Sequence, residues 1–105
     1  MRDEQYSQIL SMWINVRDDL GKYKQKLVTM LDFAEKNKTQ VAYLIGAYLR
    51  EVDELMKEMW LYKPYSHFNY PHYYRKMRML ITDTAEVRAT VDFVMSQFPN
   101  FPNYP

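Results

Sequence analysis

The chain has 105 residues, of which 48% are hydrophobic and 26% are charged, a balance typical of one globular domain and not of a disordered segment. Its formal net charge of +1 provides no overall field that would select nucleic acid, an anionic membrane or an acidic substrate. The absence of cysteine excludes disulfides and thiolate metal sites, and no apolar run approaches the roughly 20 residues that span a bilayer. The polar start of the chain shows no secretory signal, so we expect a cytoplasmic or intracellular protein that does not contact a membrane.

The first predicted helix covers residues 3–36, because apolar side chains recur there in alternating steps of three and four. This spacing keeps the side chains on one helix face and suits slightly supercoiled packing. Gly21 does not change the register, so we expect one continuous helix about 45–50 Å long. The stripe consists of Tyr6, Ile9, Trp13, Val16, Leu20, Tyr23, Leu27, Met30 and Ala34.

A second helix is predicted from about residue 40 to about residue 62, after a short polar connection. Asn37 and Gln40 have the spacing of a capping box, so we expect Asn37 to cap this helix. A connection this short forces the second helix to pack antiparallel against the first. Its stripe consists of Val41, Ile45, Tyr48, Val52, Leu55 and Met59.

A third helix is predicted from about residue 71 to residue 98, after prolines interrupt the pattern. Residues 82–84 are its weak point, because Asp83 and Glu86 also resemble a cap; a break there would give a four-helix bundle. The register continues through Thr84, so we favour one helix. The stripe consists of Tyr73, Met77, Leu80, Thr84, Val87, Val91, Val94 and Phe98.

These stripes together predict an all-α fold: an elongated antiparallel helical hairpin with a third long helix, forming a three-helix bundle. Residues 1–98 make one bundle domain, and residues 99–105 make a tail rich in proline, asparagine and aromatic residues. Apolar residues also flank the stripes, so any face left over would drive self-association or the binding of a protein partner. These flanking residues are Leu10, Ile14, Leu44, Leu49, Met56, Trp60, Ile81 and Phe93.

The tyrosine-rich segment of residues 62–74 is the first candidate binding site, because tyrosine gives rigid, amphipathic contact area. Three interpretations stay open: a surface for a protein partner, a cap over the end of the bundle, or a surface that stacks on single-stranded nucleic acid. The near-zero net charge and the acids of the second helix disfavour nucleic acid. The predicted binding residues are Tyr62, Tyr65, Phe68, Tyr70, Tyr73, Tyr74, Arg75, Lys76 and Arg78.

The tail is the second candidate, since proline at every third position favours extended chain. Phe101 and Tyr104 either dock into a groove on a neighbouring protein or pack back onto the bundle.

Metal binding and nucleophilic catalysis find no support in the pattern of the sequence. His67 and His72 are the only histidines and have no obvious third ligand, and no glycine-rich phosphate loop occurs. We therefore expect no metal and no cofactor.

The stretch LREVDEL, residues 49–55, resembles the first acidic motif of the all-α nucleoside-triphosphate pyrophosphohydrolases, the MazG-like family. The resemblance implies that Glu51, Glu54 and Asp92 hold Mg²⁺ against a substrate triphosphate, and Mg²⁺ does take oxygen ligands. The chain departs from the family at Ala89, where the motif has an acid. The resemblance covers about a dozen residues.

We expect a small non-enzymatic helical module for protein–protein interaction, acting as an accessory or assembly subunit or as an inhibitor of a larger protein. Ten tyrosines, eight methionines and no cysteine in a compact helical chain favour an origin among viral or phage accessory proteins. The alternatives are the Mg²⁺-dependent pyrophosphohydrolase and an accessory protein that binds single-stranded nucleic acid.

Overall fold

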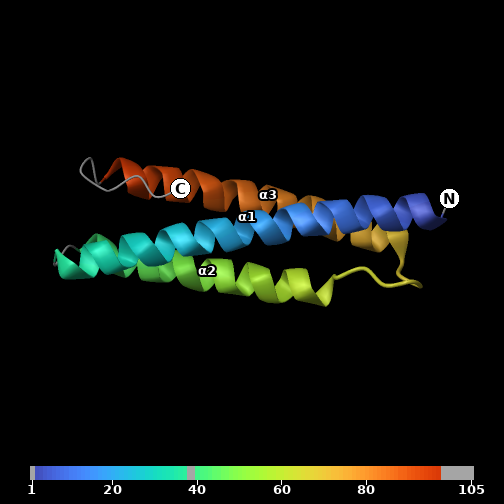
Figure 1. The fold of residues 1–105 in the computed structure, drawn as a ribbon, viewed down its shortest axis with the longest axis horizontal. Helices are drawn as coiled ribbons and strands as arrows, with labels where there is room; N and C mark the ends of the chain where they lie inside the picture. Colours follow the sequence, from blue (N-terminus) through green and yellow to red (C-terminus); the bar gives the residue numbers. More distant parts are fainter. Residues whose placement is uncertain (1, 38–39, 98–105) are drawn as a thin grey trace.

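The computed structural model describes residues 2–37 and 40–97, which form three α-helices: α1 (Arg2–Lys36), α2 (Val41–Leu61) and α3 (Tyr70–Ser96). In Figure 1, α2 runs antiparallel to α1, and α3 returns in the direction of α1. The molecule measures 53 × 22 × 16 Å. Its length is that of α1 alone, since 35 residues with a rise of 1.5 Å each span about 52 Å. The predicted elongated three-helix bundle is confirmed.

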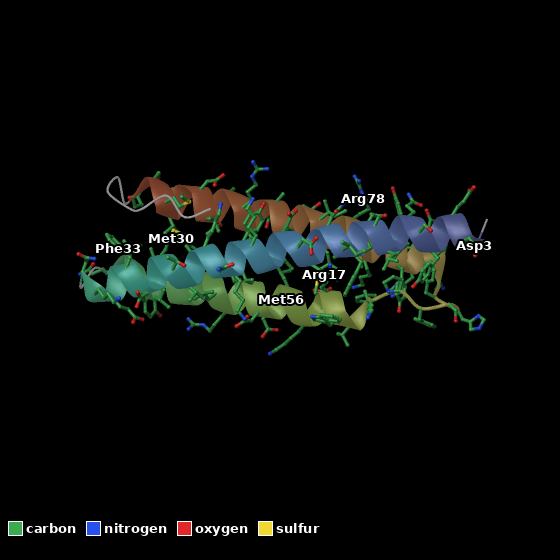
Figure 2. The ribbon with its side chains drawn as sticks, in the orientation of Figure 1. Asp3, Arg17, Met30, Phe33, Met56 and Arg78 are labelled. Atoms are coloured by element: carbon green, nitrogen blue, oxygen red, sulfur yellow. The ribbon has the colours of Figure 1, made fainter. Side chains whose placement is uncertain are left out.

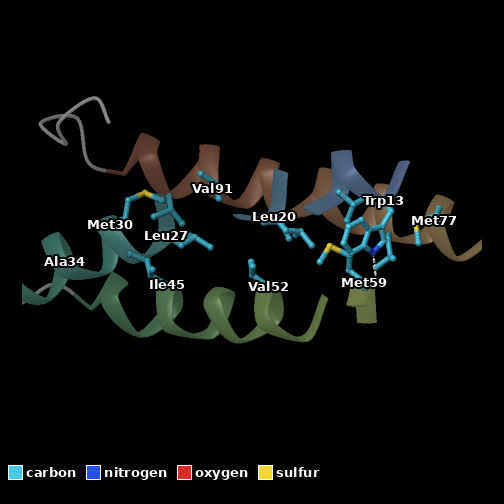
Figure 3. Packing of buried hydrophobic residues seen from close by; sticks show 14 of the residues in the cluster. Trp13, Leu20, Leu27, Met30, Ala34, Ile45, Val52, Met59, Met77 and Val91 are labelled. Atoms are coloured by element: carbon cyan, nitrogen blue, oxygen red, sulfur yellow. Dashed lines mark hydrogen bonds between the residues drawn. The ribbon is translucent and has the colours of Figure 1, made fainter. Parts of the chain in front are cut away.

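The three stripes form the core. Within the described helices, every buried side chain occupies a position in one of the predicted stripes. Figure 3 shows how Leu20 and Leu27 of α1 lie between Val52 of α2 and Val91 of α3. α1 packs against both other helices, whereas α2 and α3 contact each other much less. This asymmetry leaves the side of the bundle between α2 and α3 more open than the other two sides.

The third helix is unbroken, so the four-helix alternative is wrong. The hydroxyls of Thr82 and Thr84 donate hydrogen bonds to the carbonyl oxygens of Arg78 and Leu80, at 3.1 and 2.7 Å. Each hydroxyl therefore finds its partner one turn back in the same helix, where it shares the carbonyl oxygen with the helical backbone, and the helix continues through both threonines. Thr84 is buried, and its methyl group continues the apolar stripe through the predicted weak point.

The predicted capping box is also wrong. The side-chain amide of Asn37 donates to the carbonyl oxygen of Phe33 at 2.8 Å, so Asn37 closes the end of α1. Gln40 precedes α2 and makes no capping hydrogen bond with its side chain. The cap that the pattern missed is Asn69, whose side-chain oxygen accepts a hydrogen bond from the backbone N–H of His72 at 3.2 Å at the start of α3.

Two further points bear on the predicted boundaries. Phe98 and the predicted tail of residues 99–105, with Phe101 and Tyr104, lie outside the described residues. Among the helices that the structure describes, none combines the length and the apolar composition that crossing a membrane requires.

Candidate partner-binding surfaces

The segment of the predicted aromatic site lies at the end of the bundle where α1 begins, α2 ends and α3 begins (Figure 1). Most of its rings pack against the buried core. The ring of Tyr73 lies at its centre, with ring centroids 5.3 Å from those of both Tyr62 and Phe68. The hydroxyl of Tyr70 donates to the side-chain oxygen of Gln8, which joins the start of α3 to α1. The half-buried rings are those of Tyr62, Phe68, Tyr70, Tyr73 and Tyr74. They form a rigid aromatic layer over the end of the core.

Burial also affects the protonation of this layer. Burial raises the pKa of Tyr73 above its usual value of 10.0, and the neighbouring phenols of Tyr65 and Tyr62 raise it further. The phenol of Tyr73 is therefore neutral at physiological pH. His72 packs edge-on against Tyr62, with ring centroids 5.6 Å apart, and both His67 and His72 are exposed. Across residues 2–37 and 40–97, no three histidine, aspartate or glutamate side chains lie close enough together to hold a metal ion.

Three large apolar side chains remain exposed beside this layer, at the end of α2 and in the following loop. Trp60 is 53% exposed, Leu61 is 76% exposed and Tyr65 is 54% exposed. The three lie within six positions of sequence, and large exposed apolar patches often mark sites of protein–protein interaction. We call Trp60, Leu61, Tyr65 and the adjacent Lys63 the Trp60 surface.

The indole of Trp60 is held in place by a buried neighbour. Its ring packs edge-on against Trp13, with centroids 5.0 Å apart and an interplanar angle of 76°. Trp13 is almost fully buried, and its indole N–H donates to the carbonyl oxygen of Met59 at 2.8 Å, the dashed line in Figure 3. The buried indole is fixed by this hydrogen bond, so it offers the exposed indole a rigid support.

Cations surround the two indoles. The ammonium group of Lys63 lies 5.6 Å from the ring centroids of both Trp13 and Trp60. The guanidinium of Arg17, one turn further along α1, lies 5.5 Å from the centroid of the Trp13 ring. Both distances permit cation–π attraction. The Trp60 surface is therefore an apolar patch with a cationic rim.

The predicted basic residues of α3 differ in burial and in ion pairing. Lys76 is half-buried, lies 5.3 Å from the centroid of Tyr62 and pairs with Glu58 of α2 at 3.9 Å. Arg75 and Arg78 are exposed, and neither forms an ion pair with any residue that the structure describes. Figure 2 shows Arg78 projecting away from the bundle. Lys76 thus joins two helices, while the two arginines are free to meet a partner.

A second surface is the groove of about 670 Å³ between α2 and α3, which we call the α2–α3 groove. The acids that carry the resemblance to pyrophosphohydrolases, Glu51 and Glu54, line one wall. Asp92 lies elsewhere on α3, and the facing wall instead carries Asp83 and Glu86. The lining residues are Leu27, Tyr48, Glu51, Glu54, Leu55, Lys57, Glu58, Leu61, Asp83, Glu86, Val87 and Thr90.

Sequence reasoning found the aromatic layer and Tyr65 but missed the two exposed apolar residues at the end of α2 as binding residues. Trp60 was recognised only as an apolar residue flanking the stripe, and Leu61 was not singled out. The available signal was their register: both fall outside the core positions of α2, at its last turn, where a single-domain bundle has nothing left to cover them.

No known family model, curated protein or solved structure matches the chain.

Proposed function

We propose that this protein is a small helical interaction module that binds a larger protein, as an accessory or assembly subunit or as an inhibitor. The observation that carries the proposal is the Trp60 surface, where three large apolar side chains are each more than half exposed. Tryptophan, tyrosine and arginine are the residue types that contribute most binding energy at protein interfaces. Here Trp60 and Tyr65 are exposed, with Arg17 and Lys63 beside the indoles.

The rigidity of the surface supports the same proposal. Binding costs free energy when flexible side chains must be ordered. Trp60 already packs against Trp13, and Tyr65 packs edge-on against Tyr73 with centroids 6.1 Å apart. These contacts hold the exposed rings in place before a partner arrives, so little ordering remains to be done.

The proposal is tested by capture of the partner with matched variants. The surface variant carries Trp60→Ala and Tyr65→Ala; the control carries Tyr43→Ala and Phe93→Ala, which remove two rings that are 79% and 58% exposed elsewhere. Each tagged protein is used to capture proteins from a lysate of the organism of origin, and bound proteins are quantified by mass spectrometry. We expect the surface variant to lose a set of proteins that the unmodified chain and the control retain, with unchanged helical content by circular dichroism. Equal capture by all three proteins would contradict the proposal.

One observation favours the enzymatic alternative: Glu51 and Glu54 line the same groove as two acids of α3. A Mg²⁺-dependent pyrophosphohydrolase would release pyrophosphate from nucleoside triphosphates. The assay compares the unmodified chain with Glu51→Gln. Turnover that requires Mg²⁺ and is abolished by this substitution would establish the enzyme, and the interaction module would then be the wrong conclusion.

Compartment and origin belong to the same proposal. We place the protein in the reducing interior of a cell because the chain uses no cysteine. The viral or phage origin and the nucleic-acid alternative stay predictions. Binding to single-stranded nucleic acid would weaken steeply with added salt, because released counterions drive it.

A further inference from the structure

The α2–α3 groove has an apolar floor. Leu27 of α1 forms its base and is fully buried, and Val87 of α3 is 7% exposed. Leu55 and Tyr48 of α2 are half-buried, so part of each side chain faces the groove. The floor exists because α2 and α3 contact each other much less than α1 contacts either of them. The weaker contact between α2 and α3 leaves part of the apolar stripe of α2 without a neighbour.

The walls of the groove are acidic. The carboxylates come from both helices, and the only basic side chain among the lining residues is Lys57. Five carboxylates against one ammonium group give the lining a formal net charge of −4, in a chain whose net charge is +1. The acids are Glu51, Glu54, Glu58, Asp83 and Glu86.

Three of these acids have no cationic partner among the residues that the structure describes. Glu54 pairs with Lys57 at 3.5 Å, and Glu58 pairs with Lys76 at 3.9 Å. Within the described ranges, no ion pair involves Glu51, Asp83 or Glu86. Glu51 is on one wall and the other two are on the facing wall, so unneutralised negative charge lies on both sides of the apolar floor.

We propose that the α2–α3 groove binds a basic amphipathic helix of another protein. Such a helix places apolar residues at i, i+3, i+4 and i+7 on one face, which match an apolar floor, and lysines or arginines on both flanks, which match two acidic walls. The groove follows α2 from Tyr48 to Leu61, about 20 Å, which accommodates roughly four turns of a docked helix. The bound helix would complete a four-helix arrangement.

This inference rests on the proposed function and names the chemistry of the partner. Leu61 lines the groove and also belongs to the Trp60 surface, so the two surfaces share one exposed residue. A second copy of the chain is a poorer occupant. Pairing of two identical grooves across a twofold axis would place carboxylates against carboxylates, and like charges across an interface oppose binding.

The test uses a fluorescein-labelled synthetic helix with leucines at positions i, i+3, i+4 and i+7 and lysines elsewhere. Its control peptide has glutamate in place of every lysine. Binding is measured by fluorescence anisotropy with the full chain. We expect the lysine peptide to bind and the glutamate peptide not to bind, because only the former complements the walls.

Matched variants locate the peptide on the protein. Glu51→Gln with Glu86→Gln removes one unpaired charge from each wall and should weaken binding about tenfold, as expected for the loss of two charge pairs. Glu4→Gln with Glu35→Gln changes the net charge equally on exposed positions of α1 and should weaken it less than about twofold. Leu61→Ser, at a side chain that is 76% exposed, should also weaken binding without loss of helical content.

Several results would overturn the inference. Equal weakening by the two charge variants would mean that the lysine peptide responds only to net charge. Failure of the lysine peptide to bind, or equal binding of the glutamate peptide, would show that the groove does not select a basic helix. A stable dimer that the lysine peptide cannot displace would make a second copy the occupant. If the inference fails while Trp60→Ala with Tyr65→Ala still abolishes capture, the interaction function stands without this groove; if capture is also unchanged, both fail.

Discussion

Trp13→Phe tests whether the buried indole organises the junction of α1 and α2. The indole N–H of Trp13 donates to the carbonyl oxygen of Met59 at 2.8 Å, across 46 positions of sequence. Its ring also supports Trp60, with centroids 5.0 Å apart. Phenylalanine keeps an aromatic ring in the core but removes the donor and leaves part of the indole volume empty.

The expected cost follows from these two losses. One hydrogen bond is worth about 1 kcal/mol, and the carbonyl of Met59 keeps a second donor, the backbone N–H of Tyr62 at 3.1 Å, so it is not left unsatisfied. The smaller ring leaves a cavity that costs about 1–2 kcal/mol. We therefore expect the free energy of unfolding to fall by about 2–3 kcal/mol, a large share of the total of about 5–15 kcal/mol for a domain of this kind.

The assay is urea denaturation followed by circular dichroism, with Trp60→Phe as the control. Trp60 is 53% exposed and its indole N–H makes no hydrogen bond to any residue that the structure describes, so its replacement should cost less than about 1 kcal/mol. The two substitutions exchange the same side chains at a buried and an exposed position. Equal costs, or a change below about 0.5 kcal/mol for Trp13→Phe, would refute the role given to the buried indole.

Three further predictions concern the helices and the aromatic layer. Gly21→Ala should raise the free energy of unfolding by about 0.5–1 kcal/mol in urea denaturation, because the position is exposed within α1 and an added Cβ meets no atom within 4 Å. A lower free energy of unfolding would mean that the helix needs the glycine. Asn69→Ala should cost about 1 kcal/mol by removing the cap of α3, whereas Asn69→Asp should keep most of it; equal stability of both variants would contradict the cap. Burial raises the pKa of Tyr23 and of Tyr73 above 10.0, so the folded state retains these protons longer than the unfolded state. The free energy of unfolding should therefore be unaffected at neutral pH and should fall as the pH rises from 10 through the raised pKa values of these tyrosines. Urea midpoints measured across this range should fall less steeply with pH when both tyrosines are replaced by phenylalanine.

The fold was largely predictable because apolar residues recur along the chain in regular steps of three and four. The stripe positions alone locate every buried side chain of the described helices, since a three-and-four spacing permits only one face of each helix to be buried. The capping details were not predictable in the same way. Asn37 and Asn69 are the same residue type, and which of them caps a following helix depends on where the chain turns, which the local pattern does not specify.

The candidate surfaces were only partly predictable. The density of tyrosine in residues 62–74 marked the aromatic region, but not which rings would be half-buried and which exposed; that depends on how the loop crosses the end of the core. Glu51 and Glu54 were noticed as a motif on one helix. The pattern of one helix could not predict that Asp83 and Glu86 face Glu51 and Glu54, because the two walls of the groove come from two different helices. Their placement depends on how α2 lies beside α3.

Whether these two surfaces are free in the isolated chain is tested by the mass of the purified chain in solution, measured by light scattering across a dilution series. If the Trp60 surface and the α2–α3 groove bind a different protein, we expect the single-chain mass of 12.8 kDa at every concentration. A dimer or larger oligomer that persists on dilution, and that dissociates when Trp60 and Leu61 are replaced by serine, would contradict this expectation, because those surfaces would then be covered by another copy of the chain.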